Sequence, residues 1–212
     1  SLIYGRVYIN EESYYEGNLY QNTFNGYGKF IKGDSEYNGY FVNGYKNGKG
    51  SLNYNNKIIY DGEFNNDLFE GHGYIKWVNL QIEYIGEFKS SMLHGEGELT
   101  TLRGNKYIGT FQGNEFNGQG TFYWGMTRIF KGNYKDNKKH GQGKLICKDG
   151  SIYEGEFKDN KKQGQGKMIY AKASPYDYDY YEGQFKEEKA NGQGKMVYKS
   201  GRIYEGQFKD GR

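Results

Sequence analysis

The sequence predicts an all-β protein made of tandem antiparallel hairpins. A Y-x-G or F-x-G triplet recurs eight times, and a G-x-G pair always follows 11 and 13 residues after its aromatic residue. These openings lie 22 to 28 residues apart, a period typical of small supersecondary units stacked on their neighbours. The opening residues are Tyr15, Tyr37, Tyr60, Tyr84, Tyr107, Phe130, Tyr153 and Tyr181, with a ninth at Tyr204.

The first strand of each unit is predicted from alternation. If the opening aromatic residue is position 0, then positions 0, 2 and 4 carry an aromatic residue, a glycine and an aromatic or apolar residue, as in Tyr60, Gly62 and Phe64. The residues between them are mostly polar, as with Glu154 and Glu156. A period of two indicates a strand with one aromatic face and one face toward water.

The second strand follows from the odd positions. Position 15 is apolar in every complete unit, position 17 is commonly Tyr or Trp, and position 14 is usually polar. Each unit is therefore interpreted as a β-hairpin, and the variable lengths between units are loops. We expect the glycines at positions 2, 11 and 13 to share the aromatic face, where the missing Cβ atoms leave grooves for neighbouring rings.

Composition limits the other possibilities. Aromatic residues make up 18% of the chain, 34 residues are glycine, and the mean hydropathy is -1.02, so no thick aliphatic core is expected. Cys147 is the sole cysteine, which excludes an intrachain disulfide and a C-x-x-C zinc site. We interpret it as a buried filler at position 17, with a reactive thiol or metal contact as the alternative. No apolar stretch reaches a membrane-spanning length, so we expect a soluble protein. The lone cysteine favours a reducing, cytoplasmic compartment, and since no P-loop or metal-ligand cluster occurs, we expect neither cofactor nor metal.

The residues from Tyr153 to Tyr170, YEGEFKDNKKQGQGKMIY, resemble a MORN (membrane occupation and recognition nexus) repeat. The resemblance spans nearly the whole chain and implies an elongated single-layer sheet of tandem hairpins, a rod or trough of about 18 strands. It divides the sequence into part of a preceding repeat (1–14), eight repeats (15–203) and the start of a truncated ninth (204–212). We accordingly expect the parent chain to be longer.

The resemblance also implies a class of function. MORN arrays act as scaffolds, often as homodimers, in cytoskeletal and ciliary assemblies and at membranes, and some precede lipid kinase or methyltransferase domains. We therefore expect a non-catalytic scaffold or protein-interaction module, with homodimeric or end-to-end assembly possible through open strand edges. Peripheral phosphoinositide binding, or service as the regulatory arm of a lipid kinase, is the alternative. His72, His94 and His140 are interpreted as turn residues, and the net charge of +3 does not favour nucleic-acid binding.

The first candidate site is the aromatic trough. A partner helix or extended peptide could anchor apolar side chains on its rings. The predicted trough residues are Tyr60, Phe64, Trp77, Tyr84, Phe88, Tyr107, Phe111, Trp124, Tyr153, Phe157 and Tyr170.

Charge and loop length give two further candidates. Up to residue 129 there are 11 Lys and Arg against 14 Asp and Glu, whereas residues 130–212 hold 18 against 12. In the basic half, predicted tips at Lys138, Lys139, Lys161 and Lys162 could meet an anionic membrane or acidic protein, or could be ordinary solvated turns. The longest loop, residues 171–180, is either a tolerated insertion or an acidic contact or phosphorylation loop containing Tyr176, Asp177, Tyr178 and Asp179.

Overall fold

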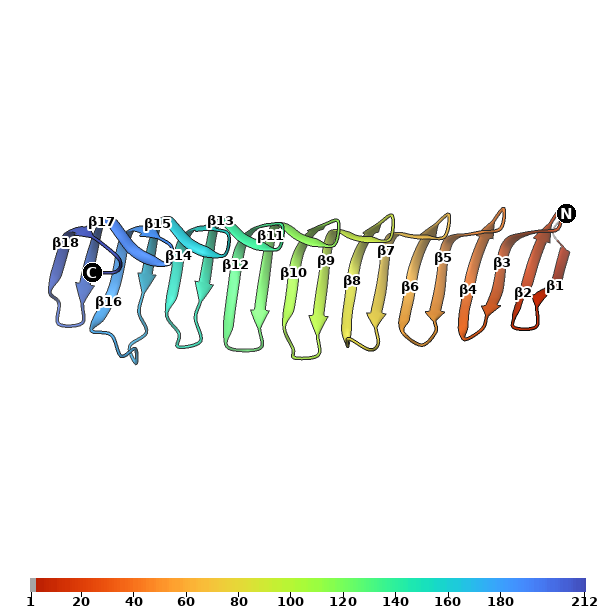
Figure 1. Cartoon of the computed structure of the whole chain (residues 1–212), viewed down its shortest axis with the longest axis horizontal. Coiled ribbons are helices and arrows are strands. Elements are labelled where there is room, and N and C mark those ends of the chain that lie inside the picture. The colour runs from red at the N-terminus through yellow and green to blue at the C-terminus, as the bar shows by residue number, and fades with distance from the viewer. Residues whose placement is uncertain (1–2) are drawn as a thin grey trace. The chain divides into compact units, whose positions relative to one another are not determined.

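The computed structural model describes residues 3–212 and is all-β (Figure 1). It contains eighteen strands and, within the described residues, no helix. The predicted fold class, tandem antiparallel hairpins numbering about eighteen strands, is confirmed. The chain divides into two compact units, Ser1–Leu102 with Phe111–Asn114, and Arg103–Thr110 with Glu115–Arg212.

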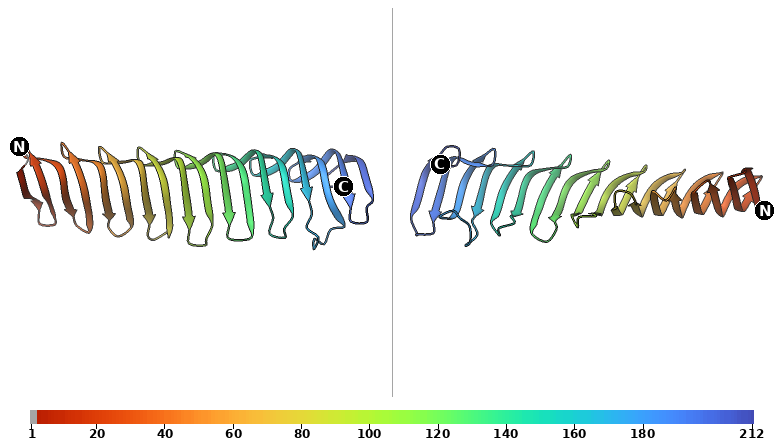
Figure 2. Two further views of the ribbon diagram at one scale, coloured as in Figure 1. Left: turned by 180° about the vertical axis from the view of Figure 1, so that it is seen from behind. Right: turned by 60° about the horizontal axis from the view of Figure 1, so that its bottom comes forward.

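Within each unit the strands pair antiparallel with their sequence neighbours, and the views in Figure 2 show each unit as a single layer. The first unit holds β1 (Ile3–Asn10), β2 (Ser13–Tyr20), β3 (Thr23–Lys32), β4 (Ser35–Val42), β5 (Tyr45–Tyr54), β6 (Ile58–Asn65), β7 (Leu68–Trp77), β8 (Ile82–Lys89) and β9 (Met92–Thr101). β10 (Lys106–Gln112) is divided between the units. The second unit continues with β11 (Glu115–Trp124), β12 (Arg128–Lys135), β13 (Lys138–Ile146), β14 (Ile152–Lys158), β15 (Lys161–Ile169), β16 (Tyr178–Lys186), β17 (Lys189–Tyr198) and β18 (Ile203–Phe208).

Two-residue turns close the hairpins. In the turn between β6 and β7, Asn66 and Asp67 have φ angles of 47° and 68°, and Asp136 and Asn137 repeat this with 49° and 64°. Two consecutive positive φ angles define a type I′ turn, whose twist matches that of the strands it joins. Asn and Asp tolerate this conformation better than other non-glycine residues, which explains why they predominate there.

The register places the predicted rows on one face. Tyr60 pairs with Ile75 in the next strand, and Gly62 pairs with Gly73. The ladder then shifts after Gly62, where Gly71 at position 11 has a φ of +62°. Our expectation that position 11 belongs to the ring groove is therefore wrong, because Gly71 lies at a β-bulge. Glycine is favoured there because the left-handed backbone conformation is strained for other residues.

The glycines at positions 2 and 13 do form the bed for the opening ring. A Cβ atom on Gly62 would lie 2.5 Å from the Tyr60 hydroxyl oxygen, and one on Gly73 would lie 2.6 Å from it. The ring can lie flat on the sheet only because both side chains are absent. The Tyr60 hydroxyl donates a hydrogen bond of 2.8 Å to the carbonyl of Glu63. The other seven opening tyrosines make the same bond to the carbonyl three residues on.

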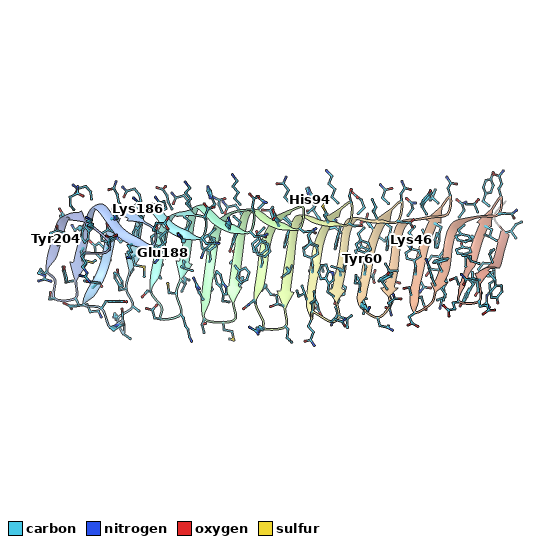
Figure 3. The ribbon with its side chains drawn as sticks, in the orientation of Figure 1. Lys46, Tyr60, His94, Lys186, Glu188 and Tyr204 are labelled. Carbon is cyan, nitrogen blue, oxygen red and sulfur yellow. The ribbon has the colours of Figure 1, made fainter. Side chains whose placement is uncertain are left out.

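Further rings pack around Tyr60. Phe69 at position 9 stacks on Tyr60 with centroids 3.9 Å apart and an interplanar angle of 13°. Phe64 and Phe88 approach the same ring edge-on at 5.0 Å and 5.3 Å. Tyr60, labelled in Figure 3, has a relative exposure of 0%. The core is thus one buried ring row between a glycine bed and a covering row, which replaces a second layer of structure.

The opposite face carries cross-strand ion pairs, and we call it the charged face. Lys76 lies 2.7 Å from Glu83, and Lys195 lies 2.9 Å from Glu205. Such exposed pairs each contribute little to the free energy of unfolding. Their importance is that they keep this face hydrated while the other face becomes the core.

Candidate functional site

Most of the predicted trough is core and does not form an open surface. Trp77, Trp124 and Tyr170 are half-buried and remain accessible to a partner. The other eight have relative exposures between 0% and 4%, so a partner cannot contact them without displacing their neighbours. These eight are Tyr60, Phe64, Tyr84, Phe88, Tyr107, Phe111, Tyr153 and Phe157.

The row that covers the core is the position-9 row, which we call the cap row. It varies from unit to unit, and its members are Phe24, Lys46, Phe69, Leu93, Phe116, Lys139, Lys162 and Ala190. Phe24 and Phe116 stack on their opening tyrosines at 4.0 Å and 3.8 Å, as Phe69 does. At these sites the apolar position-9 residue extends the aromatic surface.

Hydrogen bonds from the following turn fix the backbone of the cap row. The side-chain oxygen of Asn160 accepts a bond of 2.9 Å from the Lys139 amide, and the Asn160 amide donates at 3.0 Å to the Lys139 carbonyl. Asp67 and Ser91 hold Lys46 and Phe69 in the same way. We did not predict this ladder, although acceptor side chains at position 7 of most units were its signal.

The predicted basic tips are not four equivalent exposed charges. Lys138 is exposed beside its turn. Lys139 lies on the aromatic face with a relative exposure of 8%, because it takes the cap position. Lys161 forms an ion pair with Glu187, and Lys162 lies 3.7 Å from Glu188.

Two cavities open on the aromatic face where the cap residue is not an aromatic ring. In the first compact unit a cavity of about 250 Å³ is lined by Lys46, Tyr37 and Tyr54. In the second compact unit a cavity of about 380 Å³ is lined by Ala190 and the cluster of Tyr170, Tyr176 and Tyr178. Each of these two cavities thus borders a cap residue without an aromatic ring, Lys46 in one and Ala190 in the other.

The predicted acidic loop is shorter than expected. Tyr178 and Asp179 belong to β16, since the Asp179 carbonyl accepts a hydrogen bond of 2.9 Å from the Tyr170 amide. Tyr176 stacks parallel to Tyr178 at 6.0 Å, and its relative exposure is 57%. Asp177 is exposed beside it. This segment therefore forms one wall of the larger cavity.

The charged face also has exposed rings. Tyr27 and Tyr40 form an edge-to-face pair at 5.5 Å, with relative exposures of 55% and 52%. Sequence reasoning assigned these positions only to a solvated face.

Other reactive groups do not assemble into a site. Cys147 is half-buried, and burial raises the pKa of its thiol, which disfavours the nucleophilic thiolate. The described part of the chain contains no cluster of three metal-ligating side chains. Residues 3–212 include no helix that is long and apolar enough to cross a membrane.

Comparison with known proteins identifies the class. The MORN repeat profile matches residues 15–35, 37–57, 60–80, 84–104, 107–126, 130–152, 153–173, 181–201 and 204–212. The chain therefore belongs to the MORN-repeat family, whose members are generally non-catalytic structural modules.

Closer relatives are less informative. None of the curated proteins matches the chain. A solved structure of the SAS-4 (dCPAP) TCP domain with a proline-rich motif of Ana2 (dSTIL), from Drosophila melanogaster, is similar with a TM-score of 0.45 and 8% identity, over 76% of this chain and 84% of that one. At that TM-score the likeness does not establish a common fold.

Proposed function

We propose that this protein is a non-catalytic scaffold that holds a segment of a partner protein along its aromatic face, within a cytoskeletal or ciliary assembly of the cytoplasm. The observation that carries the proposal is that accessible rings and cavities share the aromatic face within each compact unit. The first compact unit has the half-buried Trp77 and the cavity at Lys46, and the second has the half-buried Trp124 and the cavity at Ala190. Aromatic anchors beside pockets are typical of peptide-binding surfaces.

The alternative, attachment to an anionic membrane through basic tips, has less support. Two of the four lysines have carboxylate partners from the next turn, and Lys139 lies over the rings of the aromatic face and not at a tip. Because each exposed lysine near a lipid surface contributes about 1 kcal/mol, a single free tip gives weak attachment. Sedimentation with phosphatidylserine vesicles should leave the protein in the supernatant at physiological salt.

Site-specific photocrosslinking tests the proposal. A benzophenone amino acid would replace Trp124 on the aromatic face, and in separate variants Tyr123 or Tyr40 on the charged face. Phe122 pairs with the core residue Phe130, so Phe122 and Trp124, two residues further along β11, lie on the aromatic face. Tyr123, which stands between them in the strand, points to the charged face. They therefore form a matched pair.

We expect crosslinks in cells from position 124 and not from 123 or 40. Crosslinks confined to the charged-face positions would overturn the proposal. A fourth variant would carry the benzophenone amino acid in place of Lys138. Crosslinking of that variant to lipid, with no crosslinking to protein, would favour the membrane alternative.

A further inference from the structure

Lys139 is a buried ammonium group that lacks a counter-charge. Its side-chain nitrogen lies 5.6 Å from the ring centroids of Trp124 and Phe130, and 5.7 Å from that of Phe157. Desolvation by burial lowers its pKa, with the positive charge of Arg128 next in effect. No carboxylate within the described residues 3–212 forms an ion pair with it. Cation–π contacts with three rings offset only part of the cost of burying a charge.

The other two cap-row lysines show what is missing. Lys46 lies 3.2 Å from Asp67, and Lys162 lies 3.7 Å from Glu188. Asp67 and Glu188 both occupy position 7 of the following unit. For Lys139 that position is Asn160, which holds the lysine backbone by its side-chain oxygen but brings no negative charge.

Positive charge accumulates around Lys139. The Arg128 guanidinium lies 4.5 Å from the centroid of the same Trp124 indole that Lys139 approaches. Glu188, whose field also reaches Lys139, is already paired with Lys162. The aromatic face therefore carries two cations that both approach one half-buried indole.

We propose that Lys139 and Arg128 bind a carboxylate side chain from an acidic segment of a partner protein. The inference rests on the proposed function, because it specifies the chemistry of the segment that lies on the aromatic face. A carboxylate fits because the equivalent lysines of two other units each take one. Bonds between charged groups in a partly desolvated site are stronger than neutral ones.

The test uses substitutions that the repeat itself supplies. Asn160→Asp places a carboxylate where Asp67 and Glu188 stand, so it should occupy Lys139 internally. Lys139→Phe installs the residue found at the cap positions of three other units. Asn114→Asp is the matched control, because Asn114 accepts a bond of 2.8 Å from the backbone amide of Leu93 and the cap residue that it holds is not a lysine.

The measurement is fluorescence anisotropy with a short peptide of alternating Glu and Tyr, compared with its Gln and Tyr counterpart. The unsubstituted protein should prefer the Glu peptide. Asn160→Asp and Lys139→Phe should each weaken that binding about tenfold or more, as expected for loss of one charged bond. The Asn114→Asp control should bind like the unsubstituted protein.

Equal binding of the two peptides would overturn the inference, as would full binding by the Asn160→Asp variant. So would Lys139-dependent binding to a phosphoserine peptide or to phosphatidylserine vesicles without binding to the Glu peptide. Crosslinks from position 124 together with no Glu preference would leave the proposed function standing and remove only the carboxylate site.

Discussion

In the repeat that opens with Phe130, the hydroxyl group is carried by the residue at position 4 and not by the opening residue. Phe130 lacks the hydroxyl that every other opening residue donates to a carbonyl, whereas Tyr134 at position 4 has a buried hydroxyl with no hydrogen-bond partner. The Phe130 ring still occupies the usual bed, since its Cζ lies 2.5 Å from where a Cβ on Gly143 would stand. Burial raises the pKa of Tyr134, consistent with a phenol that loses water without gaining a partner.

Two substitutions should therefore each stabilise the protein. Tyr134→Phe removes an unsatisfied buried hydroxyl, which should raise the free energy of unfolding by about 1–3 kcal/mol. Phe130→Tyr adds a hydroxyl that can donate to the carbonyl of Asn133, which should contribute about 1 kcal/mol. The two rings are in edge contact at 5.3 Å, so the double variant tests whether the effects add.

Urea unfolding followed by circular dichroism measures the change, and hydrogen exchange of the β12 and β13 amides localises it. Local exchange is needed because repeat arrays depart from two-state unfolding. The reasoning fails if Tyr134→Phe is destabilising, which would mean that the hydroxyl has a partner. It also fails if Phe130→Tyr destabilises, which would mean that the bed has no room for an oxygen.

Two other predictions follow from the buried ring row. Gly73→Ala should cost about 3 kcal/mol or more, because its Cβ would lie 2.6 Å from the Tyr60 hydroxyl oxygen, while Gly5→Ala, whose nearest contact is Leu19 at 3.4 Å, should be nearly neutral in the same urea assay. Burial raises the pKa of Tyr15 to about 12, so the folded state holds the phenol proton more tightly than the unfolded chain. That stability is fully present below pH 10 and should be lost as the pH rises toward 12, and a Tyr15→Phe variant should lose less in alkaline unfolding monitored by circular dichroism. An equally steep loss in that variant would exclude Tyr15 as a source of the effect.

The sequence was sufficient for the fold because the pattern is local. Alternation around Tyr60 predicts the first strand, position 15 predicts the second, and fixed spacing predicts that every unit is alike. The different roles of the three recurring glycine positions were harder to predict. At Gly73 the missing side chain makes room for the Tyr60 ring, whereas Gly71 is a bulge residue with a positive φ angle. The sequence does not show that φ angle, so it does not separate the two roles.

The site could be predicted only in part because burial on a single-layer sheet depends on the cap row. Sequence parity places Phe64 and Trp77 on one face but does not show that the first is 4% exposed and the second half-buried. Lys139 was expected at a turn, since a lysine among Phe equivalents suggests solvent. A two-residue turn at positions 6 and 7 moves position 9 onto the strand and over the core.

The division between fixed and variable positions explains where specificity can reside in such an array. Positions 0, 2 and 13 form the ring and its bed, so a change there costs stability. Position 9 lies over the bed from outside, and it is occupied by Phe69, Leu93, Lys139 or Ala190, which differ in size and charge. The cap row can therefore vary between units without loss of the hairpin. Under the proposed function, a partner that lies along the second compact unit would meet a ring at Phe116, a cation at Lys139 and a cavity at Ala190, so the order of cap residues would select the segment that fits.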